Sequence, residues 1–184
     1  MTTIRPATAQ DAAGIARVYI DTWRSTYAAI LPHRGLLGMS YEEQARQWSW
    51  IVRDHAQSVI VAIEADDGVV GFVGFGPARN RPAASRFAGD DARVGEIYTL
   101  YVLPDFQERG IGRQLLTGAF AALVEKRYTS GLLWALRDNH SRYFYERVGG
   151  KFIAERQERQ WGRLMDQVCY GWTDLRQVSA TSSR

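Results

Sequence analysis

The six residues QERGIG, at 107–112, constrain the fold most, because they separate two segments of opposite character. The preceding segment, EIYTLYVLP, is rich in β-branched and aromatic residues and predicts a strand. The following segment, RQLLTGAFAALVEKR, has apolar residues at helical spacing and predicts a helix over 110–127. At such a helix start several backbone N–H groups lack intrahelical acceptors, and the helix dipole adds positive charge. The sequence therefore predicts a diphosphate-binding turn here.

The glycines of this turn distinguish it from other phosphate-binding loops. Without a Cβ, Gly110 and Gly112 let the main chain approach a ligand and adopt positive φ, and Arg109 and Arg113 add positive charge beside them. A nucleotide P-loop is excluded because the string GxxxxGK[ST] does not occur in the chain. The dinucleotide fingerprint GxGxxG is not met either, because Leu115 stands where its third glycine should be. The remaining pattern is Q-x-x-G-x-G.

Composition excludes several classes of protein. The chain has 184 residues, a length typical of one domain, and its net charge of +3 suits an anionic small molecule. Nucleic-acid binders typically have a clustered stripe of Lys and Arg, and the sequence has none. The single cysteine, Cys169, cannot form an internal disulfide, and the three histidines have no metal-ligand spacing. With no signal peptide or membrane helix predicted, we expect a cytoplasmic protein that uses no metal.

The pattern of the whole chain predicts one α+β domain over 1–175, followed by a polar, disordered tail at 176–184. A glycine-rich stretch, GFVGFG at 71–76, is interpreted as a bulged strand against a bulky neighbour, because Pro77 and a loop follow it. The expected elements are a strand at 2–8, helices at 8–27 and 39–55, a hairpin at 57–79, a loop at 80–91, a strand at 92–104, a helix at 110–127, a strand at 130–137, a helix at 138–150 and a hairpin at 151–175.

Two motifs resemble those of the GCN5-related N-acetyltransferase (GNAT) superfamily. The stretch LYVLPDFQERGIGRQLL resembles its acetyl-CoA motif, and DNHSRYFYERVGGKF is similar to its second motif. The resemblance spans residues 3–174 and implies the GNAT fold. In that fold a mixed, mostly antiparallel central sheet of about seven strands is flanked by about four helices.

The resemblance implies an acetyl-CoA-dependent N-acetyltransferase. In such enzymes the acetyl group moves to a primary amine of a small molecule or peptide by direct attack in a ternary complex, with acetyl-CoA as co-substrate and no metal. The alternative is a CoA-binding regulatory module of GNAT type without turnover. We expect neither nucleic acid nor membrane as a partner, and homodimers occur among relatives.

The resemblance also implies which residues bind the coenzyme. The main chain of the motif strand would pair with the pantetheine arm as an added strand does, and the glycine turn would take the pyrophosphate. Asn139 lies six residues before Tyr145, where many members have seven, so Asn139 is expected in the loop or at the helix start. The implied contacts are Leu100, Tyr101, Val102, Gln107, Glu108, Arg109, Gly110, Ile111, Gly112, Arg113 and Asn139.

Two residues are candidates for proton transfer. Tyr145 matches the family's general acid, because a phenol of pKa ~10 can protonate a thiolate of pKa ~8.5. Glu96 is the candidate base, either directly or through a water relay, and strand alternation places it on the same face as Tyr98.

Aromatic residues near the N-terminus are candidates for the acceptor side. Trp23 and Tyr27 are four residues apart and therefore share a helix face, where they bind an alkyl amine or instead seal the core. Tyr98 is expected to contact the acceptor as well. Trp48, Trp50 and the loop at 79–91 complete the set of residues that could shape the pocket.

Overall fold

The computed structural model describes residues 1–26, 37–55, 57–89, 92–160 and 162–180. In these residues a mixed seven-stranded sheet has the order β1-β2-β3-β4-β5-β7-β6, together with six α-helices, so the α+β class and the sheet are confirmed. The strands are β1 (Thr3–Pro6), β2 (Ser58–Glu64), β3 (Gly68–Pro77), β4 (Val94–Val102), β5 (Ser130–Leu136), β6 (Lys151–Gln160) and β7 (Arg163–Trp172). The helices are α1 (Ala12–Thr26), α3 (Tyr41–Arg53), α4 (Arg81–Ala88), α5 (Ile111–Glu125), α6 (Arg142–Arg147) and α7 (Leu175–Ala180), with short 3-10 helices η1 (Ala9–Asp11) and η2 (Pro104–Phe106).

Strand directions follow from the pairings. β4 pairs with β5 in parallel, with Val94 opposite Ser130 and Ile97 opposite Leu133. In contrast, β1 with β2, β5 with β7 and β6 with β7 pair antiparallel. The chain forms two compact units, one of residues 1–74 and 99–116 and the other of residues 75–98 and 117–184. The expectation of a single domain over 1–175 stays a prediction.

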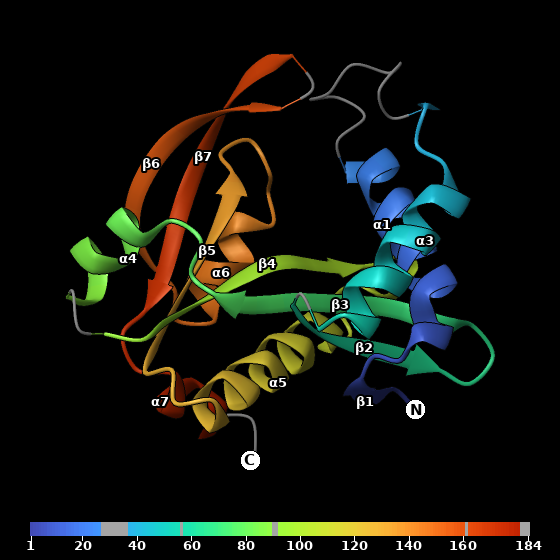
Figure 1. Ribbon diagram of the computed structural model, residues 1–184, viewed down its shortest axis with the longest axis horizontal. Coiled ribbons are helices and arrows are strands. Elements are labelled where there is room, and N and C mark those ends of the chain that lie inside the picture. The colour runs from blue at the N-terminus through green and yellow to red at the C-terminus, as the bar shows by residue number, and fades with distance from the viewer. Residues whose placement is uncertain (27–36, 56, 90–91, 161, 181–184) are drawn as a thin grey trace. The chain divides into compact units, whose positions relative to one another are not determined.

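In the first unit, α1 and α3 lie side by side (Figure 1) and bury apolar faces in one core cluster. That cluster includes Ile15, Trp48 and Phe72. The N–H and hydroxyl of Thr8 donate to Asp11 Oδ2 at 2.7 and 3.0 Å at the start of η1, which leads into α1. The Ser40 hydroxyl accepts a hydrogen bond from the Glu43 N–H at 3.3 Å at the start of α3. The capping residues therefore fix where these helices begin.

In the second unit, β6 and β7 form a long hairpin (Figure 1) whose chain reverses at Gly162, with φ of +78°. The predicted apolar stripe of α5 is buried throughout, from Ile111 to Leu123. Close approach requires a glycine at 95, because a Cβ there would lie 2.7 Å from the Leu123 side chain. The ring of Phe120 packs 5.0 Å from that of Trp172.

Two expectations differ from the structure. The expected loop at 80–91 was wrong, because α4 occupies most of it: the Asn80 side chain accepts from the Ala83 N–H at 3.1 Å, a proline lies in the first turn, and Gly89 ends the helix with φ of +88°. The expected disordered tail is helical as far as Ala180, because α7 covers 175–180. Residues 181–184 lie outside the described part of the chain.

Gly74 and Gly76 of the 71–76 stretch lie close to other side chains, and the neighbour of Gly76 is of the bulky kind expected, whereas the expected bulge stays a prediction. A Cβ at Gly74 would lie 2.7 Å from the Thr99 hydroxyl, and one at Gly76 would lie 2.6 Å from the hydroxyl of Tyr98. In the ranges that the structure describes, no helix is long and apolar enough to cross a membrane. Among the same residues no three His, Cys, Asp or Glu side chains gather as metal ligands would.

Candidate active site

The glycine turn connects β4 to α5 through two left-handed residues. After η2, the N–H of Gln107 donates to the Pro104 carbonyl at 3.1 Å, and Glu108 and Gly110 then have φ of +61° and +81°. The N–H of Gln114 donates to the Gly110 carbonyl at 3.0 Å, which starts the helical ladder. Helix geometry leaves the amides of Gly110, Ile111 and Gly112 without intrahelical acceptors. The structure thus has the strand, turn and helix start predicted from the sequence.

Open space surrounds the turn. Gln107, Glu108, Arg109 and Gly110 are exposed, and no heavy atom lies within 4 Å of the position that a Cβ on Gly110 would take. The positive φ of residue 110 favours a glycine there, since L side chains rarely adopt it. Successive amides around left-handed residues form concavities that bind anions. The turn therefore fits a phosphate group.

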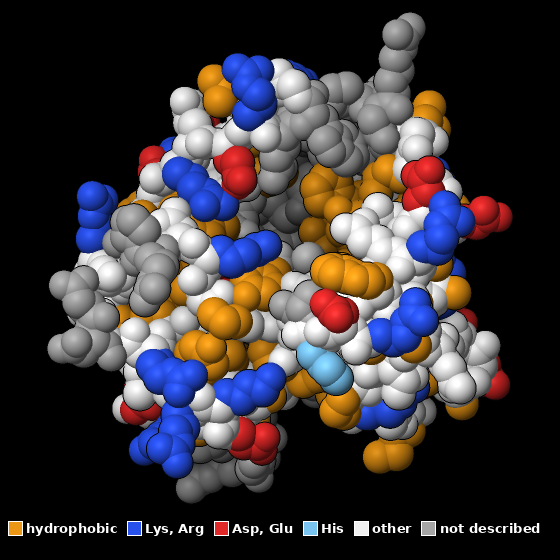
Figure 2. All heavy atoms as spheres, in the orientation of Figure 1, with side chains coloured by type: hydrophobic (Ala, Val, Ile, Leu, Met, Phe, Trp, Pro, Cys, Tyr) orange, Lys and Arg blue, Asp and Glu red, His pale blue; other side chains and the backbone are white. Residues whose placement is uncertain are grey.

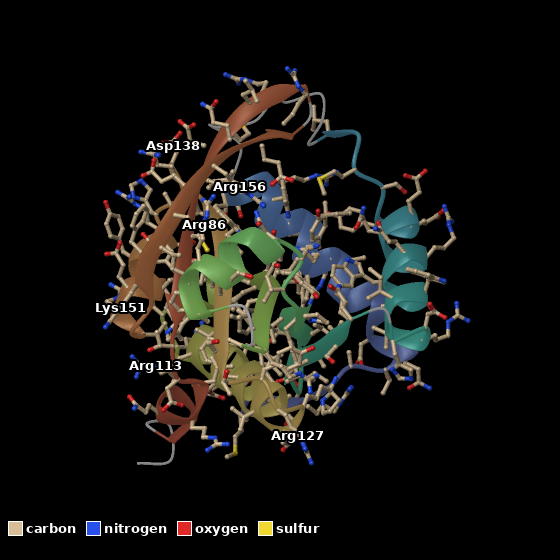
Figure 3. The ribbon with its side chains drawn as sticks, turned by 60° about the vertical axis from the view of Figure 1, so that its left-hand side comes forward. Arg86, Arg113, Arg127, Asp138, Lys151 and Arg156 are labelled. Carbon is tan, nitrogen blue, oxygen red and sulfur yellow. The ribbon has the colours of Figure 1, made fainter. Side chains whose placement is uncertain are left out.

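The side chain of Gln107 supports the turn. Its Nε2 donates to the Val102 carbonyl at 3.0 Å, so it links the turn to the last residue of β4. Positive charge comes from two arginines: the Arg109 guanidinium lies 5.0 Å from the Phe106 ring, and Arg113 is exposed on the first turn of α5 (Figure 3). The turn is therefore tied to β4 by a side chain and has two arginines beside it, together with the acidic Glu108.

The side chains of the neighbouring strand residues belong to the core rather than to a ligand site. The ring of Tyr101 packs at 5.6 Å from Tyr19, 6.4 Å from Trp23 and 5.6 Å from Phe72. Val102 is buried. Because the side chains of Tyr101 and Val102 are packed in this way, only their main-chain groups can contact a ligand. Trp23 lies in the same aromatic cluster, in agreement with the reading in which it seals the core, whereas Tyr27 lies outside the described residues.

In the second unit, Glu96 is buried and ion-paired. It is only 4% exposed, and its Oε2 accepts a 2.7 Å hydrogen bond from the main-chain N–H of Arg79. Its Oε1 lies 3.2 Å from Nη2 and 3.3 Å from Nε of the same arginine. Sequence analysis included Arg79 only as the first residue of the loop at 79–91, because nothing in the sequence pairs it with a strand residue 17 positions away.

Tyr98 lies next to this ion pair. Its hydroxyl donates to the Pro77 carbonyl at 2.6 Å, and the Arg79 guanidinium lies 3.9 Å from its ring centroid. Burial, and then the charge of Glu96, raise the pKa of Tyr98 to about 12. The phenol therefore stays protonated at neutral pH. The structure brings Glu96, Tyr98 and Arg79 together as one cluster, named the carboxylate cluster below.

Tyr145 lies within the short helix α6, and Asn139 precedes that helix. The Tyr145 side chain is 8% exposed, and its ring lies 5.4 Å from Phe144 and 6.1 Å from Tyr170. Asn139 lies in the turn before α6, where its Oδ1 accepts from the Ser141 N–H at 2.9 Å. The loop position expected for Asn139 is therefore confirmed, while its contact with coenzyme stays a prediction. Cys169 is buried, and burial raises the pKa of its thiol to about 12, so it stays protonated and unreactive at neutral pH.

Acidic and basic side chains are interspersed on the molecular face seen in Figure 2. This mixture agrees with a net charge of only +3. A polyanion such as nucleic acid is bound by an extended surface of one sign. The localised positive charge at the glycine turn instead suits a small anion.

Comparisons with known proteins agree with the geometry of the turn and sheet. A family model described as "Acetyltransferase (GNAT) family" matches residues 13–150. A Bacillus subtilis (strain 168) protein called "Uncharacterized N-acetyltransferase YuaI" is 32% identical over 184 residues, which covers 100% of both chains.

Two solved structures have the same fold. The N-acetyltransferase from Staphylococcus aureus Mu50 superimposes with a TM-score of 0.70 at 22% identity, covering 95% of this chain and 99% of that one. YncA from Salmonella typhimurium, solved with its cofactor acetyl-CoA, superimposes with a TM-score of 0.67 at 22% identity, covering 94% of each chain. The family match covers most of the chain and the B. subtilis relative covers all of it. The chain therefore belongs to the GNAT family of acetyltransferases.

Proposed function

We propose that this protein transfers the acetyl group of acetyl-CoA to a primary amine of a small molecule or peptide. The observation that carries the proposal is the glycine turn, where left-handed Glu108 and Gly110 precede the first amides of α5. Such a turn binds a phosphate group through main-chain donors. The complex of YncA with acetyl-CoA supports the choice of coenzyme.

The coenzyme would be held mainly by the main chain. The amides of the turn, from Gln107 to Arg113, would bind the pyrophosphate, with Arg109 and Arg113 adding charge. The main chain of Leu100, Tyr101 and Val102 would pair with the pantetheine amides as an added strand does. In the described residues, β4 pairs with β5 over Val94–Ile97. Leu100, Tyr101 and Val102 lie beyond the end of this parallel ladder.

The reaction needs two proton transfers. The amine nitrogen attacks the thioester carbonyl carbon, a C–N bond forms, and the C–S bond breaks to release the thiolate of coenzyme A. We assign Tyr145 to donate a proton to that thiolate, since a phenol of pKa ~10 lies close to a thiol of pKa ~8.5. The acceptor nitrogen loses two protons: the first leaves the ammonium before the attack and goes to Glu96 directly or through a water molecule, and the second leaves the nitrogen after the attack and replaces the proton that Tyr145 gives to the thiolate. Holding both substrates together makes the attack effectively intramolecular.

A thiol-release assay tests the proposal. Acetyl-CoA is incubated with the protein and a panel of amines that includes polyamines, aminoglycosides, amino acids and peptides, while free thiol is followed and coenzyme binding is measured by calorimetry. We expect micromolar coenzyme affinity and thiol release with at least one class of amine. Coenzyme binding with no thiol release from any amine would favour the alternative, a regulatory module without turnover. Absence of coenzyme binding would refute both.

A further inference from the structure

The carboxylate cluster has a feature that the proposed reaction does not require: Glu96 already holds a cation. The guanidinium of Arg79 lies against Oε1 and over the ring of Tyr98, with its central carbon 3.9 Å from the ring centroid. A carboxylate beside an aromatic face is the environment in which proteins bind alkylammonium and guanidinium groups. The position occupied by the Arg79 head group is therefore a cation site.

The carboxylate does not depend on this guanidinium for its position. The shortest hydrogen bond to Glu96 comes from the main-chain N–H of Arg79, at 2.7 Å to Oε2. The guanidinium reaches the other oxygen at 3.2 and 3.3 Å, which are longer contacts. Hydrogen bonds of 2.7–2.9 Å are typical where a charged group is held strongly. If the arginine head group left, the main-chain donor would still hold the carboxylate.

The guanidinium is also exposed to solvent. The Arg79 side chain is 65% exposed, whereas that of Glu96 is 5% exposed. Water can solvate the displaced guanidinium, and an incoming cation takes over its pairing with the buried carboxylate, so the exchange leaves no buried charge unpaired. The arginine can thus exchange with another cation at small cost.

The remaining wall of this site is fixed. The Tyr98 hydroxyl donates to the Pro77 carbonyl at 2.6 Å. A Cβ on residue 76 would lie 2.6–3.2 Å from the hydroxyl and ring atoms of Tyr98. Because residue 76 is glycine, the ring lies directly against the β3 backbone. An incoming cation would meet the same ring face and the same carboxylate oxygen that Arg79 meets now.

We propose that Glu96 and Tyr98 bind the protonated amine of the acceptor, and that the Arg79 guanidinium fills this site until an acceptor displaces it. The inference rests on the proposed function, and it names the acceptor as a cationic alkylamine. Displacement places the ammonium nitrogen beside Oε1 of Glu96, the oxygen that would take its proton. Arg79 thus acts as an internal competitor of the substrate.

Binding of n-butylammonium chloride in the absence of acetyl-CoA tests this, with butan-1-ol as the uncharged counterpart, by NMR titration. We expect Arg79→Met to bind butylammonium about fivefold more tightly than the wild type, in keeping with the modest strength of an exposed ion pair. The double variant Arg79→Met/Glu96→Gln should lose that gain, and butan-1-ol should show no difference. Arg86→Met is the matched control, because Arg86 is an exposed arginine of the adjacent helix α4 (Figure 3). Unchanged or weaker binding by folded Arg79→Met would overturn the inference.

A second measurement uses the wild type, in case Arg79→Met does not fold. The side-chain Nε–H resonance of Arg79, assigned by its absence in Arg79→Lys, should shift on saturation with butylammonium and not with butan-1-ol. A resonance that stays in place would also overturn the inference. Coenzyme binding is measured separately. If the protein does not bind coenzyme, the proposed function is refuted. If it binds coenzyme and the Arg79 substitution does not change butylammonium binding, only the displacement is refuted.

Discussion

The glycine turn and the carboxylate cluster both involve β4, yet they are built in opposite ways. The turn presents main-chain amides, and its residues from Gln107 to Gly110 are exposed. The cluster is made of side chains, and its charged member Glu96 is 4% exposed and held by contacts from Arg79. If both regions act as proposed, the backbone conformation decides function in the turn, while in the cluster the identity of each side chain does. Substitutions should therefore act differently in the two places.

The largest effect is expected from Gly110→Val. A valine at φ of +81° strains the turn by roughly 1–3 kcal/mol and moves its amides, so coenzyme A affinity should fall about 100-fold. Gly68→Val is the matched control, since Gly68 has φ of +69° and equally open surroundings at the β2–β3 turn. Calorimetry and thermal unfolding should show that both variants lose stability while only Gly110→Val loses affinity. Equal coenzyme affinity in the two variants would show that the backbone conformation of the glycine turn does not determine coenzyme binding.

Tyr145→Phe tests the side-chain chemistry. Removing the phenol hydroxyl should lower turnover by about a hundredfold, the lower end of the range for acid catalysis, and leave coenzyme affinity unchanged. Tyr143→Phe serves as control because Tyr143 is 46% exposed. Steady-state kinetics and calorimetry separate the two effects. A parallel loss of turnover and affinity would assign Tyr145 to binding rather than to proton transfer.

A smaller effect is expected from Gln107→Ala. This change removes the hydrogen bond to the Val102 carbonyl but leaves the amides of the turn, so coenzyme affinity should fall about fivefold. Gln157→Ala, on β6, removes a comparable hydrogen bond to Asp166 and should leave affinity unchanged. A loss as large as that of Gly110→Val would show that the glutamine side chain, and not the backbone, is the main coenzyme contact.

The smallest effect concerns Tyr98 and alkaline pH. Because the folded pKa of about 12 lies above the ordinary value of 10, Tyr98 contributes stability that is fully present below pH 10 and is lost as pH rises toward 12. Tyr98→Phe also removes the hydrogen bond to the Pro77 carbonyl, so its free energy of unfolding at pH 8 should fall by about 1 kcal/mol. Urea unfolding from pH 8 to 12 should show the two curves converging. A constant difference across that range would refute the titration of Tyr98.

Features set by local sequence were predictable. The caps at Thr8 and Ser40, the turn at Gly68 and the buried stripe of α5 each depend on residues close together in the chain. Helix α4 also had local signals, an asparagine cap with a proline two residues later and a glycine at its end. These signals did not lead to a predicted helix, because a segment of eight residues is too short to show a clear helical spacing of apolar residues.

Contacts between distant segments were not predictable in the same way. Alternation along a strand placed Glu96 and Tyr98 on one face, but it could not show that Arg79 pairs with both. The position of Trp23 was equally open from sequence, since an aromatic stripe on a helix suits a pocket as well as a core. Its packing against Tyr101 depends on a strand almost 80 residues away.

The absence of a Cβ at Gly76 has a consequence for engineering. The phenol ring of Tyr98 rests where any larger residue at that position would start, so Gly76→Ala would push the ring off the β3 backbone. The ring that we propose contacts the acceptor cation would then tilt, while the turn that we propose binds the coenzyme would keep its sequence. A library confined to positions 76 and 79 is thus a route to new amine preferences with the acetyl donor unchanged.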